Sequence, residues 1–259
     1  MECRLLGKLI IEGEIEAKTG IRVGGPQTGL KISGVDLSVI RDPWGKPYVP
    51  GSSIKGKLRS LLEHSEDCRF EGGKHECRDS ASYRKCPSCR IFGVAPGGAE
   101  FNVPSLTRLM VSDAYLLNEA ELKQLHEAGN LELELTEVKA ETAIDRVQGK
   151  ARSGGLRQVE RVPAGARFGL RLVLNVYSDE DKPELVPKIF KALSLLEDDY
   201  LGGMGSRGYG RVKVGALALR WNSAEDYQKG SLGKPPVNEG LDTPQKLVSG
   251  MEQVLNRLA

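Results

Sequence analysis

Two periods recur in the hydrophobic pattern of this chain. In residues 4–17 Leu9, Ile11, Gly13, Ile15 and Ala17 fall on one side of an alternation, while Lys8, Glu12, Glu14 and Glu16 fall on the other. A two-residue period predicts half-buried strands, because successive side chains of a strand point to opposite faces. The segments with this alternation are 4–17, 131–141 and 168–176, and further strands are predicted at about 108–117 and 209–220.

Elsewhere apolar residues recur every three or four positions, which predicts amphipathic helices. The helices are expected at about 53–64, 119–128 and 183–198, and from Thr243-Pro244 to near the end of the chain. Ser52 or Ser53 is a natural N-cap for the first helix, and Asn118 with Glu121 forms a capping box for the second. The buried stripe of the first helix is predicted as Ile54, Leu58, Leu61 and Leu62.

Without the intervening segments, the order of elements is strand, helix, strand, strand, helix, strand. This β-α-β-β-α-β order is that of ferredoxin-like folds, which RNA-recognition modules (RRM-like folds) also use, so the predicted class is α+β. We expect a ferredoxin-like domain over 1–221, with insertions at 65–92 and 142–163, and a C-terminal tail with a helix over 222–259. The aromatic RNA-stacking motif of such modules is absent, so any RNA contact would run through loops and the second insertion.

Composition narrows the class of protein without naming a function. Of 259 residues 39% are hydrophobic and 28% charged, which is typical of soluble globular proteins. The net charge is only +2, so charge is informative only locally. Because no apolar run reaches about 18 residues and the N-terminal segment lacks a signal-peptide pattern, we expect a cytoplasmic protein with no membrane partner.

Four of the five cysteines lie in the insertion at 65–92, in the pattern Cys-x6-His-x-Cys-x8-Cys-x2-Cys. Cys-x2-Cys and His-x-Cys pairs each supply half of a tetrahedral zinc site. The predicted ligands are His75, Cys77, Cys86 and Cys89, with Cys68 as a substitute for His75. Four protein ligands leave no place for water, so the zinc would be structural. The alternative is that Cys86 and Cys89 are redox-active or free thiols.

Positive charge concentrates in and after the second insertion. Residues 146–171 hold seven basic residues against one acid, a local charge of +6. With Gly154-Gly155 near the middle of 142–163 and few large apolar side chains there, this segment is predicted to be a projecting basic hairpin. The basic residues are Arg146, Lys150, Arg152, Arg157, Arg161, Arg167 and Arg171.

Two glycine-containing segments are candidates for phosphate binding. Gly51-Ser52-Ser53 opens the first helix, and Lys55, Lys57 and Arg59 follow within two turns. A helix start of this kind can hold an anion, although the same residues are often no more than a cap and solvated lysines. The second segment, Leu201–Arg211, contains five glycines and two arginines, a composition typical of loops that cradle phosphates with backbone N–H groups.

Several motifs, in this order, resemble the repeat-associated mysterious protein (RAMP) superfamily: GSSIKGKLR, CPSCRIFG, VSDA, TEVKAETAIDR, RQVERVPAGARF and YLGGMGSRGYGRV. More specifically, they resemble the backbone subunit of type III-A CRISPR (Csm) effector complexes. The resemblance covers roughly residues 5–215 and is specific, because the motifs agree in both order and spacing.

This resemblance implies a function. Copies of the subunit would stack along a guide RNA (crRNA) together with other subunits of the complex, and a thumb-like hairpin at 142–163 would interrupt the guide–target duplex at regular intervals. Asp36, in a loop between Gly34 and Pro43, would cut single-stranded target RNA with Mg²⁺ or another divalent cation. Many family members have Ser-Pro where this chain has Leu37-Ser38. The implied guide-binding residues are Ser52, Ser53, Lys55, Arg59, Gly203, Gly205, Ser206, Arg207 and Arg211.

Two alternatives belong to other classes. One is a non-catalytic scaffold that binds crRNA, in which Asp36 is only a turn residue. The other is a guide-processing RAMP nuclease, which relies on general acid–base groups such as histidine. The chain has only three histidines, and one is assigned to zinc, which makes that alternative the weaker one.

Overall fold

A four-stranded antiparallel sheet forms the centre of the protein. The computed structural model describes residues 4–24, 36–95 and 106–258. Within them the strand order is β3-β7-β1-β8, and every neighbouring pair is antiparallel. These strands are β1 (Gly7–Ala17), β3 (Leu109–Val111), β7 (Arg167–Val176) and β8 (Val212–Ser223). The predicted alternation is confirmed, since the odd-numbered apolar side chains of β1 and the even-numbered ones of β7 are buried.

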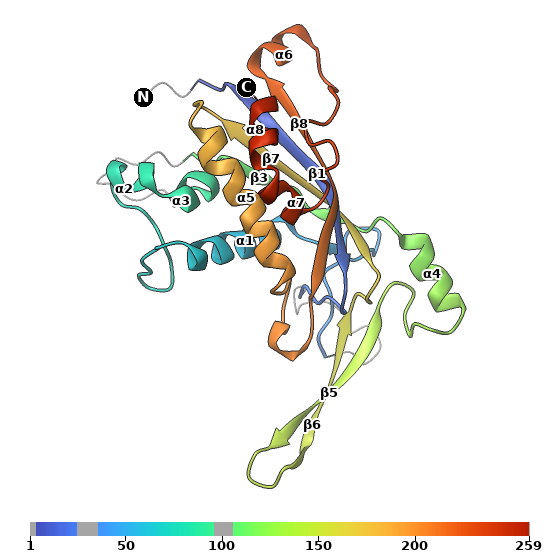
Figure 1. Ribbon diagram of the computed structural model, residues 1–259. Coiled ribbons are helices and arrows are strands. Elements are labelled where there is room, and N and C mark those ends of the chain that lie inside the picture. The colour runs from blue at the N-terminus through green and yellow to red at the C-terminus, as the bar shows by residue number, and fades with distance from the viewer. Residues whose placement is uncertain (1–3, 25–35, 96–105, 259) are drawn as a thin grey trace.

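Helices cover one face of this sheet. Figure 1 shows α1 (Gly51–Ser65) and α5 (Asp181–Glu197) side by side on that face. Ile54, Leu58 and Leu62 of α1 are 0–1% exposed and join a core that includes the predicted stripe of α5. Burial of each such side chain contributes about 1.5–3 kcal/mol relative to exposure. The core therefore fixes where α1 begins, and with it the residues predicted to hold phosphate.

The opposite face of the sheet is a lattice of paired charges. Glu12 of β1 pairs with Arg171 of β7 and Arg220 of β8, and Glu14 lies 3.6 Å from Arg167. Arg167, Arg171 and Arg220 are thereby neutralised by the carboxylates of β1. This face is not a basic surface, although two of the arginines counted in the basic segment of the sequence lie on it.

A two-stranded hairpin projects from the body of the protein (Figure 1). It consists of β5 (Glu137–Asp145) and β6 (Lys150–Arg161), which pair antiparallel. The hairpin begins at Glu137 rather than at Thr142, because the alternation at 131–141 enters the first hairpin strand instead of the central sheet. Val147 at its tip is 96% exposed.

Other boundaries differ from prediction for local reasons. The strand expected at 108–117 is divided into β3 and β4 (Ala114–Tyr115), and β4 pairs with β2 (Tyr48–Val49) instead of continuing in the central sheet. The capping box of α4 (Glu119–Glu127) does not form. The side-chain Oδ1 of Asn118 instead accepts from the Arg167 backbone N–H, and its side-chain Nδ2 donates to the Glu121 carboxylate.

The C-terminal segment folds back onto α5 and the end of β8. The single helix expected from Thr243 is two helices, α7 (Pro244–Ser249) and α8 (Met251–Arg257), which break at Gly250. Another short helix, α6 (Ala224–Lys229), directly follows β8. Among the described residues, no helix has the length and apolarity to span a bilayer.

The cysteine module is our name for residues 65–92, which contain the cysteine pattern. It holds α2 (Ser80–Lys85) and α3 (Pro87–Phe92), and a buried ion network joins it to the core. Asp181 is fully buried, and its carboxylate lies 2.8 Å from Arg90 of α3 and 3.2 Å from Arg108. Burial alone would raise the pKa of Asp181, but the Tyr177 N–H and the two arginines outweigh it and lower that pKa.

Candidate metal centre and nucleic-acid interface

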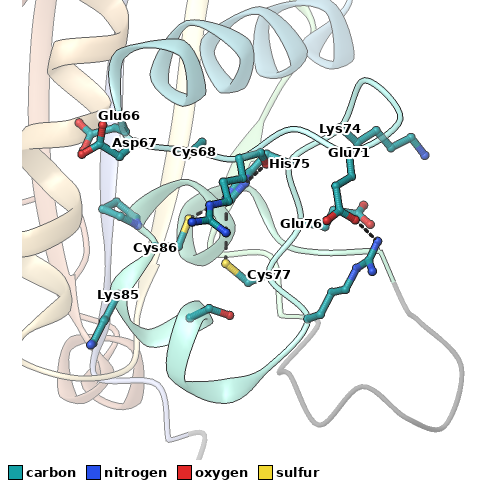
Figure 2. Close-up of a pocket in the computed structure, with 14 residues that line it drawn as sticks. Glu66, Asp67, Cys68, Glu71, Lys74, His75, Glu76, Cys77, Lys85 and Cys86 are labelled. Carbon is teal, nitrogen blue, oxygen red and sulfur yellow. Dashed lines mark hydrogen bonds and ion pairs between the residues drawn. The ribbon is translucent and has the colours of Figure 1, made fainter.

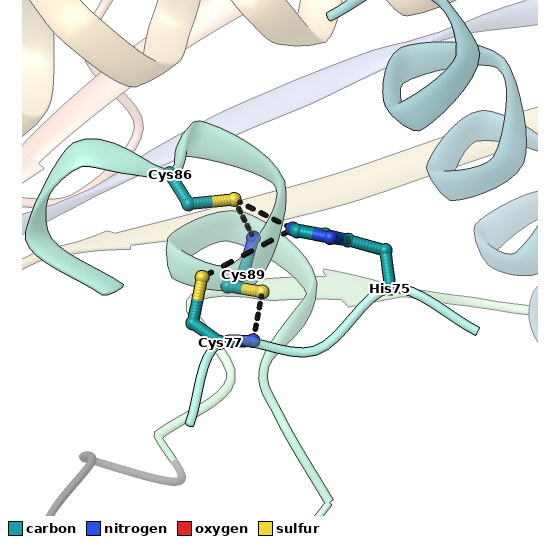
Figure 3. A group of neighbouring side chains, drawn as sticks. All are labelled: His75, Cys77, Cys86 and Cys89. Atoms are coloured by element: carbon teal, nitrogen blue, oxygen red, sulfur yellow. Dashed lines mark hydrogen bonds between the residues drawn. The ribbon is translucent and has the colours of Figure 1, made fainter. Parts of the chain in front are cut away.

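The four predicted metal ligands come together in the cysteine module (Figure 3). His75 and Cys77 lie in the loop before α2, Cys86 is the N-cap of α3, and Cys89 lies in its first turn. Their ligand atoms all lie within 4.8 Å of one another. His75 Nε2 is 3.2 Å from Cys86 Sγ and 4.0 Å from Cys77 Sγ.

The spacing of this cluster fits a tetrahedral metal. Zinc bonds of about 2.3 Å to sulfur and 2.0–2.1 Å to nitrogen place a tetrahedral N···S pair roughly 3.5 Å apart, between the two observed separations. The donor set of three sulfurs and one nitrogen is one that structural zinc sites use. No oxygen ligand belongs to the group.

Without a metal, the thiols of the cluster share their protons unevenly. A hydrogen bond from the Cys89 side chain, followed by the Cys89 N–H and His75, lowers the pKa of Cys86 to about 4, although burial opposes it. The same Cys86 side chain, together with burial, raises the pKa of Cys89. The cluster therefore holds a thiolate at Cys86, and a bound cation would favour deprotonation of the others.

A hollow of about 630 Å³ adjoins the cluster, and Cys68, Cys77 and Cys86 all line it (Figure 2). Cys68 is outside the group of four ligand atoms. Burial, followed by the charge of Cys86, raises the pKa of Cys68 to about 12, so it remains a neutral thiol. The geometry favours His75 over Cys68 as the fourth ligand.

Arg59 connects α1 to the cysteine module. Its guanidinium donates to the Glu63 carboxylate at 2.7 Å and to the backbone oxygen of His75 at 2.8 Å. Glu63 is buried and accepts from the Ser88 hydroxyl at 3.1 Å. The structure thus places Arg59, a predicted guide-binding residue, in a contact that supports a metal ligand.

The start of α1 is closed by the protein itself. The helix begins at Gly51, so Ser52 and Ser53 lie inside its first turn, and neither caps it. The Gly51 N–H donates to Asp113 at 2.7 Å. A β-carbon at Gly51 would lie 2.4 Å from the backbone oxygen of Val111, so this glycine permits a close approach to β3. Ser52 remains exposed at this end.

The two lysines of this first helix differ in their contacts. Lys57 lies 3.0 Å from Asp199 and stands over the Tyr200 ring at 3.7 Å, which ties α1 to the segment before the glycine-rich loop. Lys55 makes no ion pair with any described residue. Burial and then repulsion by Arg59 lower the pKa of Lys55. Lys55 is therefore the lysine available to an external anion.

The glycine-rich loop is fixed rather than flexible. It contains the 3₁₀ turn η1 (Gly205–Arg207), and its N–H groups at Gly203 and Gly210 donate to the backbone oxygens of Arg22 and Gly20. A side chain at Gly205 would meet the Tyr200 ring at 2.0 Å. Ser206, Arg207 and Arg211 are exposed, and their side chains extend from this supported turn.

Asp36 is held at the root of the hairpin. Its N–H donates to the Gln158 oxygen at 3.1 Å, and its Oδ2 accepts from the Gln158 N–H at 3.0 Å. Leu37 continues this contact by pairing with Val159. Within the described part of the chain, the hydrogen bonds of Asp36 go to β6 and not to α1, and its Oδ1 has no partner. Gly34, the predicted flank of this loop, lies outside the described residues.

Two other aspartates, Asp42 and Asp113, have structural contacts. Asp42 Oδ1 accepts from the N–H groups of Trp44 and Lys46, which closes a turn. Asp113 is bound to the first turn of α1. Among these three described carboxylates, Asp36 and Asp113 are exposed, but only Asp36 lies at the root of the hairpin.

The basic residues of segment 146–171 separate into two groups. Arg161 pairs with Glu137 at the base of the hairpin, and Arg167 and Arg171 of β7 pair with carboxylates of β1. Four basic residues nearer the tip of the hairpin make no ion pair with any described residue. They are Arg146, Lys150, Arg152 and Arg157. A groove of about 660 Å³ runs between the hairpin and the glycine-rich loop, and Lys139 and Glu141 line it without having been predicted as functional. Their shared face with Glu137 in the alternating sequence was the available clue.

Comparisons with known proteins agree with the resemblance that the sequence motifs indicate. The family model described as "RAMP superfamily" matches residues 14–213, so the chain belongs to the RAMP superfamily. It is 39% identical over 255 residues to the CRISPR system Cms endoribonuclease Csm3 of Methanocaldococcus jannaschii, with 96% of this chain and 95% of the relative covered. The chain is therefore a homologue of Csm3.

Solved structures agree with this assignment. A Csm3–Csm4 subcomplex of the type III-A CRISPR-Cas interference complex matches with a TM-score of 0.58 and 30% identity, covering 96% of this chain and 97% of the other. The Methanopyrus kandleri Csm3 structure matches with a TM-score of 0.66 at 24% identity, covering 98% and 99% of the two chains, and supports the fold alone. The mixed α/β architecture with antiparallel sheets is that of RAMP proteins.

Proposed function

We propose that this chain is the endoribonuclease subunit of a type III-A CRISPR interference complex, which binds crRNA and cuts complementary target RNA at regular intervals. The observation that carries the proposal is the exposed carboxylate of Asp36 at the root of a projecting basic hairpin. The Csm3 relatives, which are named as endoribonucleases, favour this over a scaffold without activity.

Guide binding would use the side of the protein where cations are unpaired. Lys55 and Ser52 at the start of α1, together with Ser206, Arg207 and Arg211 of the supported turn, would contact phosphates. The remaining predicted contacts are Ser53, Gly203 and Gly205, while Arg59 would act mainly through the cysteine module. Phosphate contacts position RNA without reading its sequence, as a subunit that serves many guides requires.

Cleavage would use the 2′-hydroxyl of the target as the nucleophile. Its oxygen would attack the adjacent phosphorus, the bond to the 5′-oxygen of the next nucleotide would break, and the products would be a 2′,3′-cyclic phosphate and a 5′-hydroxyl. Asp36, through its free Oδ1, would hold a hydrated divalent cation or orient the 2′-hydroxyl. A bound Mg²⁺ supplies charge stabilisation at the scissile phosphate. The hairpin would splay the target backbone at this point, which favours in-line attack.

The finer structural assignments are part of the same proposal. A ferredoxin-like core over 1–221 is supported by the antiparallel strand order, and 222–259 would be an appended tail. The cysteine module would hold structural Zn²⁺ through His75, Cys77, Cys86 and Cys89, a set whose geometry fits that metal. Residues 142–163 would act as the thumb. The partners would be further copies of the chain in a filament, crRNA, single-stranded target RNA and other complex subunits, in the cytoplasm.

The test is target cleavage by the guide-loaded assembly, with Mg²⁺ and with a chelator. Regularly spaced products that need the cation and disappear in Asp36→Ala support the proposal. Intact target under saturating Mg²⁺, with target binding demonstrated separately, would instead indicate the scaffold.

A further inference from the structure

The groove between the hairpin and the glycine-rich loop combines cations with a single acid. Lys139, Arg146 and Arg157 of the hairpin and Arg207 of the loop line it, a composition that attracts nucleic-acid phosphates. Among the described residues that line the groove, Glu141 of β5 is the only acid. An acid here repels the ligand that the cations attract, so its presence calls for a specific role.

The Glu141 carboxylate is enclosed, with the Tyr209 hydroxyl beside it, and its contacts with the two nearest cations are long. Its side chain is only 14% exposed. Arg207 Nη1 lies 3.5 Å from Glu141 Oε2 and Lys139 Nζ lies 3.7 Å from Oε1, both longer than the roughly 2.7–2.9 Å of a charge-assisted hydrogen bond. A carboxylate has about four acceptor positions, so these two long contacts leave it able to accept a further hydrogen bond.

Tyr209 holds this arrangement from below. Its ring is buried, and the charged groups of Lys139 and Arg161 lie 4.4 and 5.0 Å from the ring centre. Burial, followed by the neighbouring Glu141, raises the pKa of Tyr209 to about 12, so the phenol remains neutral. The packing fixes Lys139, and with it one side of the carboxylate, at the floor of the groove.

A nucleic-acid backbone offers such a carboxylate very few donors. Phosphate and sugar-ring oxygens only accept hydrogen bonds, whereas the 2′-hydroxyl of RNA can donate one and DNA lacks it. We infer that Glu141 accepts a hydrogen bond from a ribose 2′-hydroxyl of the strand in this groove, which makes the groove selective for RNA over DNA. This inference rests on the proposed function and specifies how the same surface recognises its guide.

The experiment measures binding of the full-length chain to three short oligonucleotides of equal length. They are made of uridine, 2′-O-methyluridine and 2′-deoxyuridine, and the methylated one keeps an RNA-like sugar while lacking the donor. The wild type should bind the uridine oligonucleotide roughly tenfold more tightly than the other two, the size of one hydrogen bond to a charged group.

In Glu141→Ala this preference should fall to near one, chiefly because the two oligonucleotides without the donor bind more tightly once the repulsion is removed. Glu141→Gln keeps an acceptor oxygen and should keep part of the preference. The matched control is Glu137→Gln, which removes the same charge from the same strand, but at a carboxylate already 2.7 Å from Arg161. It should keep the full preference, and melting temperatures check that each variant is folded.

Three outcomes would overturn the inference while leaving guide binding intact. The wild type could bind all three oligonucleotides equally, Glu141→Ala could keep the wild-type preference, or it could bind all three more tightly by the same factor, which would indicate repulsion alone. If the wild type bound none of them, the proposed guide binding would fail as well.

Discussion

Three arginine side chains in and beside the cysteine module are paired within the fold, whereas the cations at the end of the hairpin are not. Arg59, Arg90 and Arg108 each contact a buried carboxylate. Arg146 and Arg152 face solvent with no partner among the described residues. A cation that is already neutralised contributes to the fold, and one that is left unpaired is available to a polyanion. Changes in the module should therefore alter stability, and changes on the RNA-facing side should alter function.

Asp36→Ala should produce the largest effect and belongs to the functional side of this comparison. Cleavage of target RNA by the assembled complex should fall by at least about 100-fold, the lower end of what one catalytic group contributes. Stability should change by no more than about 1 kcal/mol, because only an exposed hydrogen bond to Gln158 is lost. Rates at saturating Mg²⁺ and urea denaturation measure the two quantities. Wild-type cleavage with normal target binding would remove Asp36 from the mechanism.

Asp181→Asn tests the structural side. Removal of one charge from a buried, hydrogen-bonded ion network typically costs about 3–5 kcal/mol, and denaturant unfolding measures it. Because the pKa of Asp181 is lowered in the folded state, its contribution is complete above the ordinary Asp pKa of about 3.9 and is lost as pH falls through the folded pKa. The wild type should therefore lose stability on acidification more steeply than the variant. Asp179→Asn, at an exposed carboxylate, is the control and should behave as wild type.

Cys86→Ser should remove the proposed metal and loosen the cysteine module, while the structure around Asp36 should stay unchanged. Elemental analysis should find about one zinc per wild-type chain, as one tetrahedral site requires, and much less in the variant. Hydrogen exchange should increase in residues 65–92 more than near Asp36. Wild-type protein purified without chelator and containing no metal would contradict the zinc assignment.

Lys55→Ala should have the smallest effect, and Lys57→Ala is its matched partner on the same helix. Loss of one phosphate contact should weaken binding to unrelated single-stranded RNAs equally and reduce the salt slope by about 0.7. Lys57→Ala should weaken α1 packing against Asp199 and leave the salt slope nearly unchanged. Fluorescence titrations at several salt concentrations distinguish the two. A loss restricted to one RNA sequence in Lys55→Ala would indicate base recognition instead.

The clustering of the four predicted metal ligands could be anticipated because they are close together in the sequence. His75 to Cys89 span one short segment whose spacing alone nearly forces the two halves of the cluster together. The strands and the two long helices were also predictable, since their buried faces repeat with the expected periods. The division at Gly250 and the early start of the hairpin were missed, because local periodicity does not report which partner strand or helix a segment packs against.

Contacts between segments that are distant in the sequence determine which charged residues are paired, and the sequence alone does not reveal those contacts. The +6 segment contains three arginines that carboxylates of β1 and β5 neutralise, and sequence distance hides those pairs. Arg59 was assigned to RNA, yet it donates to a backbone oxygen, which has no sequence signature at all. Glu141 was overlooked because it stands among other acids in the sequence, such as Glu137 and Asp145, and only the fold places it in a basic groove.

The double contact between Asp36 and Gln158 also has a mechanical consequence. From Lys150 to Gln158, β6 extends about 26 Å at roughly 3.3 Å per residue, with the carboxylate beside the pivot and Val147 beyond the far end. The hairpin is thus a lever whose fulcrum carries the acid. If the hairpin rocks about this contact, its tip would move much farther than Asp36. The place of the cut would then be registered to the fulcrum, whatever the sequence of the strand that crosses it.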